Sequence, residues 1–70
     1  YEKAENFLKR AVELMPEDPI VNDHYGDILW MLDRKIQARY FWSMVLLMKD
    51  AEGELIDQIN DKLILGPKKS

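Results

Sequence analysis

The sequence predicts an all-α fold in which four helices pack as antiparallel hairpins. Apolar residues recur at helical spacing in four segments, which proline, glycine or acidic residues separate. Identical residues also recur 34 positions apart, as the pairs Ala4/Ala38, Phe7/Phe41, Asp23/Asp57, Asp27/Asp61 and Leu29/Leu63. A period of this length is typical of stacked helical pairs, in which each unit buries its apolar face against its neighbours.

Composition limits the class of protein further. The chain has 70 residues, 47% hydrophobic and 33% charged, which fits one small folded and soluble domain. A net charge of -3 disfavours nucleic acid as a partner. No apolar run approaches the roughly 20 residues of a membrane-spanning helix, so we expect no membrane insertion. The absence of cysteine excludes disulfides and thiolate sites, and it leaves the compartment open between cytoplasm and periplasm.

The first two helices have clear boundaries in the sequence. The first is predicted over residues 1–15, because Pro16 ends its pattern. The second is predicted over residues 19–32, with Asp18 as the capping acceptor and Pro19 at the first helical position. Its inward stripe is Val21, Tyr25, Ile28, Leu29 and Leu32. Gly26 interrupts this helix, and we expect its bare backbone to let a neighbouring helix approach closely.

Two further helices complete the chain. Asp33 and Arg34 form a tight corner in which aspartate tolerates the left-handed conformation. The third helix is predicted over residues 35–49 and the fourth over residues 53–65, ended by Gly66 and Pro67. Residues 67–70 are expected to form a frayed tail. Such short connections make consecutive helices antiparallel.

These residues resemble the tetratricopeptide repeat (TPR) family, whose unit is a hairpin of a helix A and a helix B. Residues 1–16 resemble helix B of a truncated repeat, 17–50 a complete repeat and 51–66 the C-terminal capping helix. The positions that match the family pattern are Ala4, Leu8, Ala11, Pro16, Tyr25, Gly26, Leu29, Ala38, Trp42 and Val45. The chain departs from that pattern at Asn22, Asp33 and Asp50, which replace a large residue, a turn glycine and a terminal proline. The stretch from Asn22 to Trp42 also resembles the last repeat of bacterial TPR proteins.

The resemblance implies a right-handed α-solenoid that acts as a non-enzymatic protein-interaction scaffold. It implies a peptide-binding groove lined by Asp23, Asp27, Trp30, Met31, Asp57 and Asp61. TPR domains that hold a peptide carboxylate use lysine and asparagine at such positions, and aspartate would repel that group. We therefore expect a basic, or mixed basic and apolar, peptide as the partner. The alternative is a solvated acidic face that binds nothing.

A second candidate surface is apolar. Tyr40, Met44 and Leu47 add a stripe to the third predicted helix, although the positions 34 residues earlier are the polar Asn6, Arg10 and Glu13. The stripe is either an interface or filler for a loosely packed last unit. Phe7, on a first helix that lacks its partner, is a further interface residue, and we expect self-association. A purely structural cap that docks through the stripe is therefore the alternative function.

The residues offer little for catalysis. The chain has no cysteine or threonine, its hydroxyl groups besides tyrosine are Ser43 and Ser70, and its one imidazole is His24. No nucleophile, base and orienting group can be assembled from this set. His24 and Asp27, three residues apart, lack a third metal ligand, and the glycines are too isolated to hold phosphate. We expect no enzyme activity, no metal and no cofactor.

Overall fold

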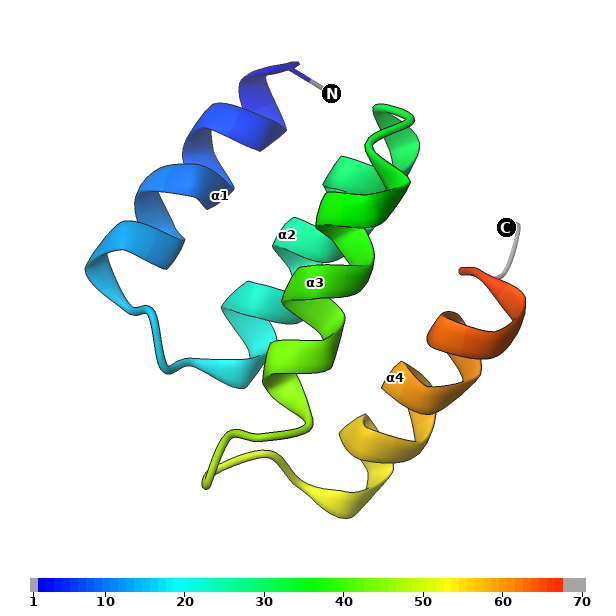
Figure 1. The fold of residues 1–70 in the computed structure, drawn as a ribbon. Helices are drawn as coiled ribbons and strands as arrows, with labels where there is room; N and C mark the ends of the chain where they lie inside the picture. Colours follow the sequence, from blue (N-terminus) through cyan, green and yellow to red (C-terminus); the bar gives the residue numbers. More distant parts are fainter. Residues whose placement is uncertain (1, 68–70) are drawn as a thin grey trace.

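The computed structural model describes residues 2–67 and is all-α, with four helices in that range. They are α1 (Glu2–Leu14), α2 (Pro19–Met31), α3 (Lys35–Val45) and α4 (Gly53–Leu65). Consecutive helices run antiparallel, so the chain forms helical hairpins with α1 and α4 at opposite flanks (Figure 1). The predicted all-α class and helical hairpins are confirmed. The expected tail falls on Pro67 and on residues 68–70, and the latter lie outside the described residues.

Both ends of α2 are fixed by local hydrogen bonds. The Asp18 carboxylate accepts hydrogen bonds from the N–H groups of Ile20 at 2.9 Å and Val21 at 3.1 Å, as predicted for a capping residue. At the other end, Asp33 adopts a positive φ of 62°. Its N–H donates to the carbonyl of Trp30, and the N–H of Arg34 donates to the carbonyl of Leu29. This pair of bonds is a Schellman motif with aspartate in the position that glycine usually takes.

The third helix ends earlier than the sequence pattern predicts. It stops at Val45, whereas the apolar pattern extends to residue 49. The N–H groups of Leu46, Leu47 and Met48 each bond to the carbonyl three residues earlier, so the chain tightens into turns after Val45. Leu46 and Met48 pack against the core from these turns. The pattern overshoots because apolar residues continue into a segment that packs partly on the core without being helical.

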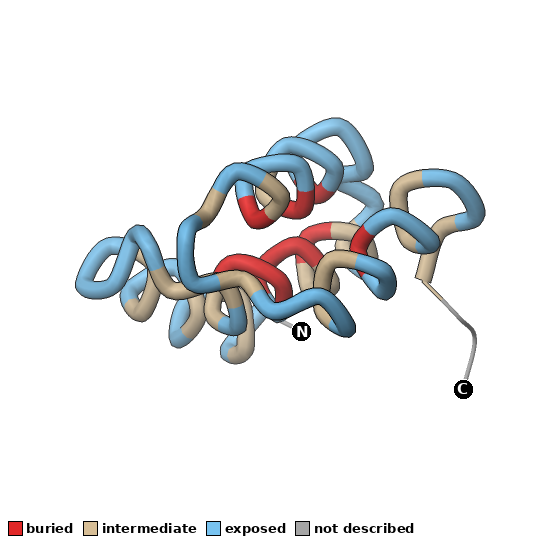
Figure 2. Tube along the Cα trace, turned by 90° about the horizontal axis from the view of Figure 1, so that it is seen from below, coloured by how far each residue is buried: buried red, intermediate tan, exposed pale blue. Residues whose placement is uncertain are grey.

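The core lies between α2 and α3 and is closed by α4. Its buried apolar residues are Tyr25, Leu29, Ala38, Trp42, Val45 and Ile59. Figure 2 shows the buried segments on the sides of the helices that face one another. The indole of Trp42 lies directly against Gly26, where a Cβ would stand only 2.3 Å from Nε1. The expected close approach at Gly26 is therefore confirmed, and Trp42 is the residue that needs it.

Asn22 is buried, with 3% of its surface exposed, although the TPR pattern has a large residue at this position. Its side-chain amide donates hydrogen bonds to the carbonyls of Pro16 at 3.1 Å and Asp18 at 2.8 Å. A buried amide is tolerated when its donors are satisfied in this way. Asn22 therefore ties α2 to the connection that precedes it.

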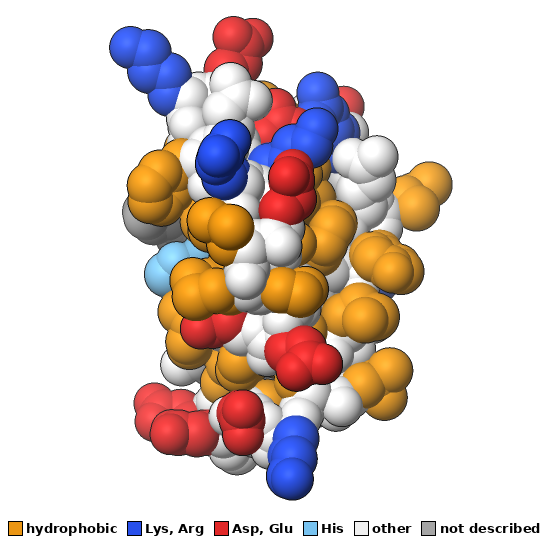
Figure 3. Space-filling model, turned by 90° about the vertical axis from the view of Figure 1, so that its left-hand side faces the viewer, with side chains coloured by type: hydrophobic (Ala, Val, Ile, Leu, Met, Phe, Trp, Pro, Cys, Tyr) orange, Lys and Arg blue, Asp and Glu red, His pale blue; other side chains and the backbone are white. Residues whose placement is uncertain are grey.

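The flank formed by α1 is less covered. No residue of α1 is fully buried, and Leu8 and Val12 pack only partly against the core. Figure 3 views the molecule from this flank, where hydrophobic side chains gather over the middle and charged side chains lie toward both ends. An apolar surface of this kind is available for contact with another molecule.

Candidate functional site

A groove lies between the C-terminal halves of α2 and α4. It encloses about 400 Å³ and is lined by Asp27, Met31, Gln58, Asp61, Lys62, Gly66 and Pro67. Three of the residues predicted to line a groove are among them: Asp27, Met31 and Asp61. Asp27 and Met31 are one turn apart on α2, and Asp61 is on α4, so the two helices form opposite walls. We define this surface as the α2–α4 groove.

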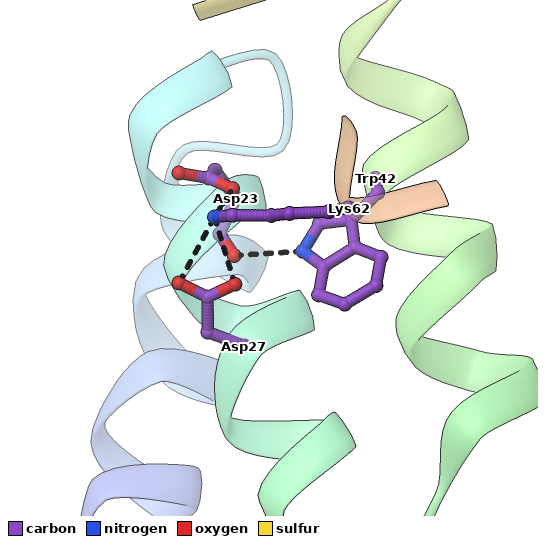
Figure 4. Close-up of polar contacts among 4 residues, drawn as sticks. All are labelled: Asp23, Asp27, Trp42 and Lys62. Atoms are coloured by element: carbon purple, nitrogen blue, oxygen red, sulfur yellow. Dashed lines mark hydrogen bonds and ion pairs between the residues drawn. The ribbon is translucent and has the colours of Figure 1, made fainter. Parts of the chain in front are cut away.

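The charged centre of the groove is Lys62. Its Nζ lies 2.7 Å from Oδ1 of Asp23 and 2.9 Å from Oδ1 of Asp27. Figure 4 shows the Lys62 side chain extending from α4 past the Trp42 ring to these two carboxylates on α2. Its Nζ lies 5.8 Å from the centroid of that ring, within range of a cation–π interaction. Lys62 therefore joins α4 to α2 past the Trp42 side chain of α3.

Trp42 connects this charged cluster to the core. Its indole N–H donates to the backbone carbonyl of Asp23 at 3.2 Å, so the same residue is fixed through its main chain and its side chain (Figure 4). Asp23 is buried, with 5% of its surface exposed. A carboxylate buried this deeply requires a hydrogen-bonded counter-charge, which Lys62 supplies.

The electrostatics of the cluster are unbalanced, because one ammonium serves two carboxylates. Burial raises the pKa of Asp27, and the hydrogen bond from Lys62 offsets only part of that effect while the nearby Asp23 adds to it. The pKa of Lys62 is also raised: burial is the largest single influence and lowers it, but the two carboxylates together outweigh burial. The pKa of Asp27 is therefore raised chiefly by burial, and the pKa of Lys62 is raised by its two carboxylate partners.

The other predicted groove residues are placed differently. Asp57 is exposed on α4 and does not line the groove, whereas Asp61 is exposed and does. Trp30 is not among the residues that line the groove. Its ring packs on Trp42 at a centroid distance of 5.5 Å, and Nζ of Lys35 lies 5.1 Å from the centroid of the Trp30 ring. The four aspartates therefore do not form one continuous row. Two are held by Lys62, Asp61 lines the groove and forms no ion pair with another residue of 2–67, and Asp57 does not line the groove.

Reasoning from the sequence missed Lys62 and Gln58. The 34-residue period pairs Lys62 with the apolar Ile28, so comparison of equivalent positions gave no reason to consider a charge there. One signal was present, because Lys62 is the only cationic residue in the segment predicted as the fourth helix. A single cation beside several aspartates is a candidate for a buried ion pair.

The predicted interface residues are all exposed. Leu47 and Phe7 expose 82% and 75% of their surfaces, and Tyr40 and Met44 are also exposed. Met44 and Leu47 lie together beside a second hollow of about 430 Å³, which is lined by Pro16, Glu17, Met44, Leu47, Met48, Lys49 and Asp50. Tyr40 and Met44 are on α3, Leu47 is in the turn after it and Phe7 is on α1. The structure therefore provides an apolar patch on α3 and its following turns, and a separate one on α1.

The remaining chemistry is limited. Within residues 2–67, no three His, Cys, Asp or Glu side chains are grouped closely enough to hold a metal ion. His24 is exposed, and Asp27 is engaged by Lys62. The same part of the chain contains no helix that is both long and apolar enough to cross a bilayer.

Comparisons of the chain with protein-family models, with curated proteins and with solved structures gave no match. The functional argument therefore rests on the site itself.

Proposed function

We propose that the chain is a non-enzymatic protein-interaction module that binds a basic, or mixed basic and apolar, peptide segment in the α2–α4 groove. The observation that carries this proposal is the charge of the groove. Among the described residues, Asp23 and Asp27 share the one Lys62 ammonium and Asp61 lines the same groove, so the site keeps an excess of negative charge beside the apolar Met31 and Pro67. A peptide cation next to an apolar side chain complements this surface.

The position of Lys62 determines which carboxylate of the groove a ligand cation can bind. Its ammonium already lies between Asp23 and Asp27 and bonds to both carboxylate oxygens of Asp27, so the carboxylate left for an incoming cation is Asp61. An anionic group would meet Asp61 and would find Lys62 neutralised by its two partners. The groove therefore selects against a peptide carboxylate.

The TPR resemblance supports the proposal, because TPR arrays present grooves of this kind to extended peptides. We place the chain as the end of a right-handed TPR-like α-solenoid, with residues 17–50 as the complete repeat and α4 as the capping helix. The four antiparallel helices are the arrangement that such an array requires.

The experiment compares two exposed aspartates of α4. End-blocked peptides with a central arginine, lysine or glutamate between apolar residues are titrated by calorimetry against the protein and its variants. Asp61→Asn is expected to weaken binding of the arginine and lysine peptides about tenfold, while Asp57→Asn, outside the groove, leaves it unchanged. Equal losses in both variants would indicate a general charge effect. Preference for the glutamate peptide would contradict the proposal.

A second candidate function is structural docking through the apolar stripe of Tyr40, Met44 and Leu47. The observation in its favour is their exposure beside the hollow next to Pro16 and Met48. Under this reading, Met44→Glu abolishes partner capture by the full-length protein and Asp61→Asn does not. The groove reading predicts the reverse, so one pull-down with both variants distinguishes the two functions.

A further inference from the structure

Two polar side chains of the α2–α4 groove stand outside the Lys62 cluster. Gln58 and Asp61 both line the groove and are both exposed, whereas Lys62 bonds to Asp23 and Asp27. Gln58 and Asp61 are three residues apart on α4, so they lie on one face of the helix with their Cβ atoms about 5–6 Å apart. The α4 wall of the groove therefore offers an amide oxygen beside a carboxylate.

The Lys62 cluster shows the geometry in which this protein holds an ammonium group. Its Nζ lies 2.7 Å from Oδ1 of Asp23, and 2.9 and 3.2 Å from Oδ1 and Oδ2 of Asp27. Three oxygen atoms of two carboxylates thus converge on one point, which suits a compact cation with three donors. The rest of the described groove lining has one carboxylate, that of Asp61, and the amide of Gln58 is displaced from it along the helix. These two acceptors suit a cation whose donors are spread over a wider group.

The chain already places such a cation, a guanidinium, against α4. Nη2 of Arg39, from α3, donates a hydrogen bond to the carbonyl of Leu63 in the last turn of α4. The helices α2 and α4 run in the same direction, so both have their C-terminal ends on one side of the molecule (Figure 1). These ends carry partial negative charge, and the last turn of α2 contains no basic residue. A further cation is therefore favoured on this side, and arginine is one that already binds there.

The apolar lining of the groove also favours a guanidinium over an ammonium. Met31, half exposed, and Pro67 line the groove beside the polar side chains. A guanidinium is planar and weakly hydrated, so it loses little when one of its faces lies on an apolar surface. An ammonium is strongly hydrated and loses more. A guanidinium also has five N–H donors, enough for a pair of hydrogen bonds to one carboxylate and a further bond to an amide oxygen.

We propose that the residue bound in the α2–α4 groove is an arginine of the peptide, with Asp61 as its charge partner and Gln58 as the residue that selects it over lysine. The proposal rests on the proposed function, because it names the basic residue that the groove binds. The guanidinium donates two hydrogen bonds to the Asp61 carboxylate and one to the amide oxygen of Gln58. Its flat face lies toward Met31.

The test uses end-blocked peptides that differ only in a central arginine or lysine, titrated by calorimetry against the protein and its variants. The unchanged protein is expected to bind the arginine peptide about fivefold more tightly than the lysine peptide. Gln58→Ala is expected to reduce this ratio to about twofold, mainly by weakening the arginine peptide. Asn60→Ala removes an exposed amide of the same helix outside the groove and should leave the ratio unchanged. Circular dichroism checks that each variant keeps its helix content.

Gln58→Glu provides the complementary measurement. A second carboxylate close to Asp61 imitates the pair that holds Lys62, so it should strengthen the lysine peptide more than the arginine peptide and remove the preference. Equal binding of both peptides by the unchanged protein, or a preference for lysine, would overturn the proposal and leave the binding of basic peptides standing. Failure of both peptides to bind would overturn the proposed function itself. An arginine preference that stays at its full value in Gln58→Ala and Gln58→Glu would overturn the role of Gln58.

Discussion

The helices α2 and α4 are counterparts in the 34-residue period, yet the same residue behaves differently in each. Asp23 is buried and bonded to Lys62, whereas its counterpart Asp57 is exposed. Asp27 is partly buried with a raised pKa, whereas Asp61 is exposed on the groove wall. The cause is the number of neighbours, because α2 lies between α1 and α3 while α4 packs mainly against α3. A repeated residue therefore does not have a repeated role.

The two helices also differ in how they begin and in how closely a neighbour approaches. The counterpart of Asp18, which caps α2, is Glu52, which precedes α4 and makes no side-chain capping bond. The counterpart of Gly26, which lies under Trp42, is the exposed Asn60. The helix α2 is thus constrained by its cap, by the close contact with Trp42 and by the ion pair with Lys62. Of these, α4 takes part only in the ion pair. Substitutions at equivalent positions can measure each constraint separately.

The largest expected effect is that of Gly26→Ala. The new Cβ would lie 2.3 Å from Nε1 of Trp42, so the indole has to move and its hydrogen bond to the carbonyl of Asp23 is disturbed. Overpacking of this kind is expected to lower the free energy of unfolding by about 3 kcal/mol, despite the better helix propensity of alanine. Urea denaturation followed by circular dichroism measures the change.

Asn60→Ala is the matched control for Gly26→Ala. Asn60 is exposed at the equivalent position of α4, so alanine meets no neighbour there and slightly favours the helix. We expect its free energy of unfolding to stay within about 0.5 kcal/mol of the unchanged protein. A similar loss in both variants would mean that the Trp42 contact is not what distinguishes α2.

The next effect is that of Lys62→Met, which keeps the length of the side chain but removes the charge. Asp23 and Asp27 then lie one turn apart on α2 without Lys62 as their counter-ion, and Asp23 exposes only 5% of its surface. Removing one member of a buried ion pair leaves the other charge uncompensated. We expect a loss of about 2 kcal/mol at neutral pH, less than for a fully enclosed pair because the groove is open. Lys9→Met, at an exposed position of α1, serves as the control.

The free energy of unfolding lost in Lys62→Met should depend on pH if the effect of Lys62 is electrostatic. The pKa of Lys62 lies above its ordinary value of 10.5, so its contribution is complete below that pH and is lost as the pH rises through the folded-state pKa. As the pH falls, Asp27, whose pKa is raised by burial, takes up a proton, and Lys62→Met then leaves one unpaired charge fewer. The difference in free energy of unfolding between the unchanged protein and Lys62→Met should therefore become smaller at acidic pH and at strongly alkaline pH. A gap that is constant with pH would assign the role of Lys62 to packing by its methylene groups.

The sequence predicts the helices better than it predicts the site, and particular residues show why. Asp18 and Asp33 act through bonds to their own neighbours in the chain, and Pro19 acts through its fixed φ, so local rules place all three correctly. The predicted end of α3 was wrong because apolar spacing cannot distinguish a helix from turns that pack partly on the core. Lys62 was missed because its role depends on which helices meet in space. Periodicity reports which residues are equivalent, and only packing decides which of them become buried.

The smallest expected effect concerns the start of α4, where Glu52→Asp should add the cap that α2 already has. Glu52 has the extended backbone that a capping residue needs, with φ of -81° and ψ of 155°, close to the -81° and 115° of Asp18. Its side chain is one methylene longer and makes no capping bond. Aspartate is expected to raise the free energy of unfolding by about 0.5 kcal/mol, while Asp18→Ala lowers it by about 1 kcal/mol. Glu54→Asp shortens a neighbouring side chain without providing a cap and should give no gain. If Glu52→Asp also gives none, the stability of α4 depends on its contact with α3 and on Lys62, and not on how the helix begins.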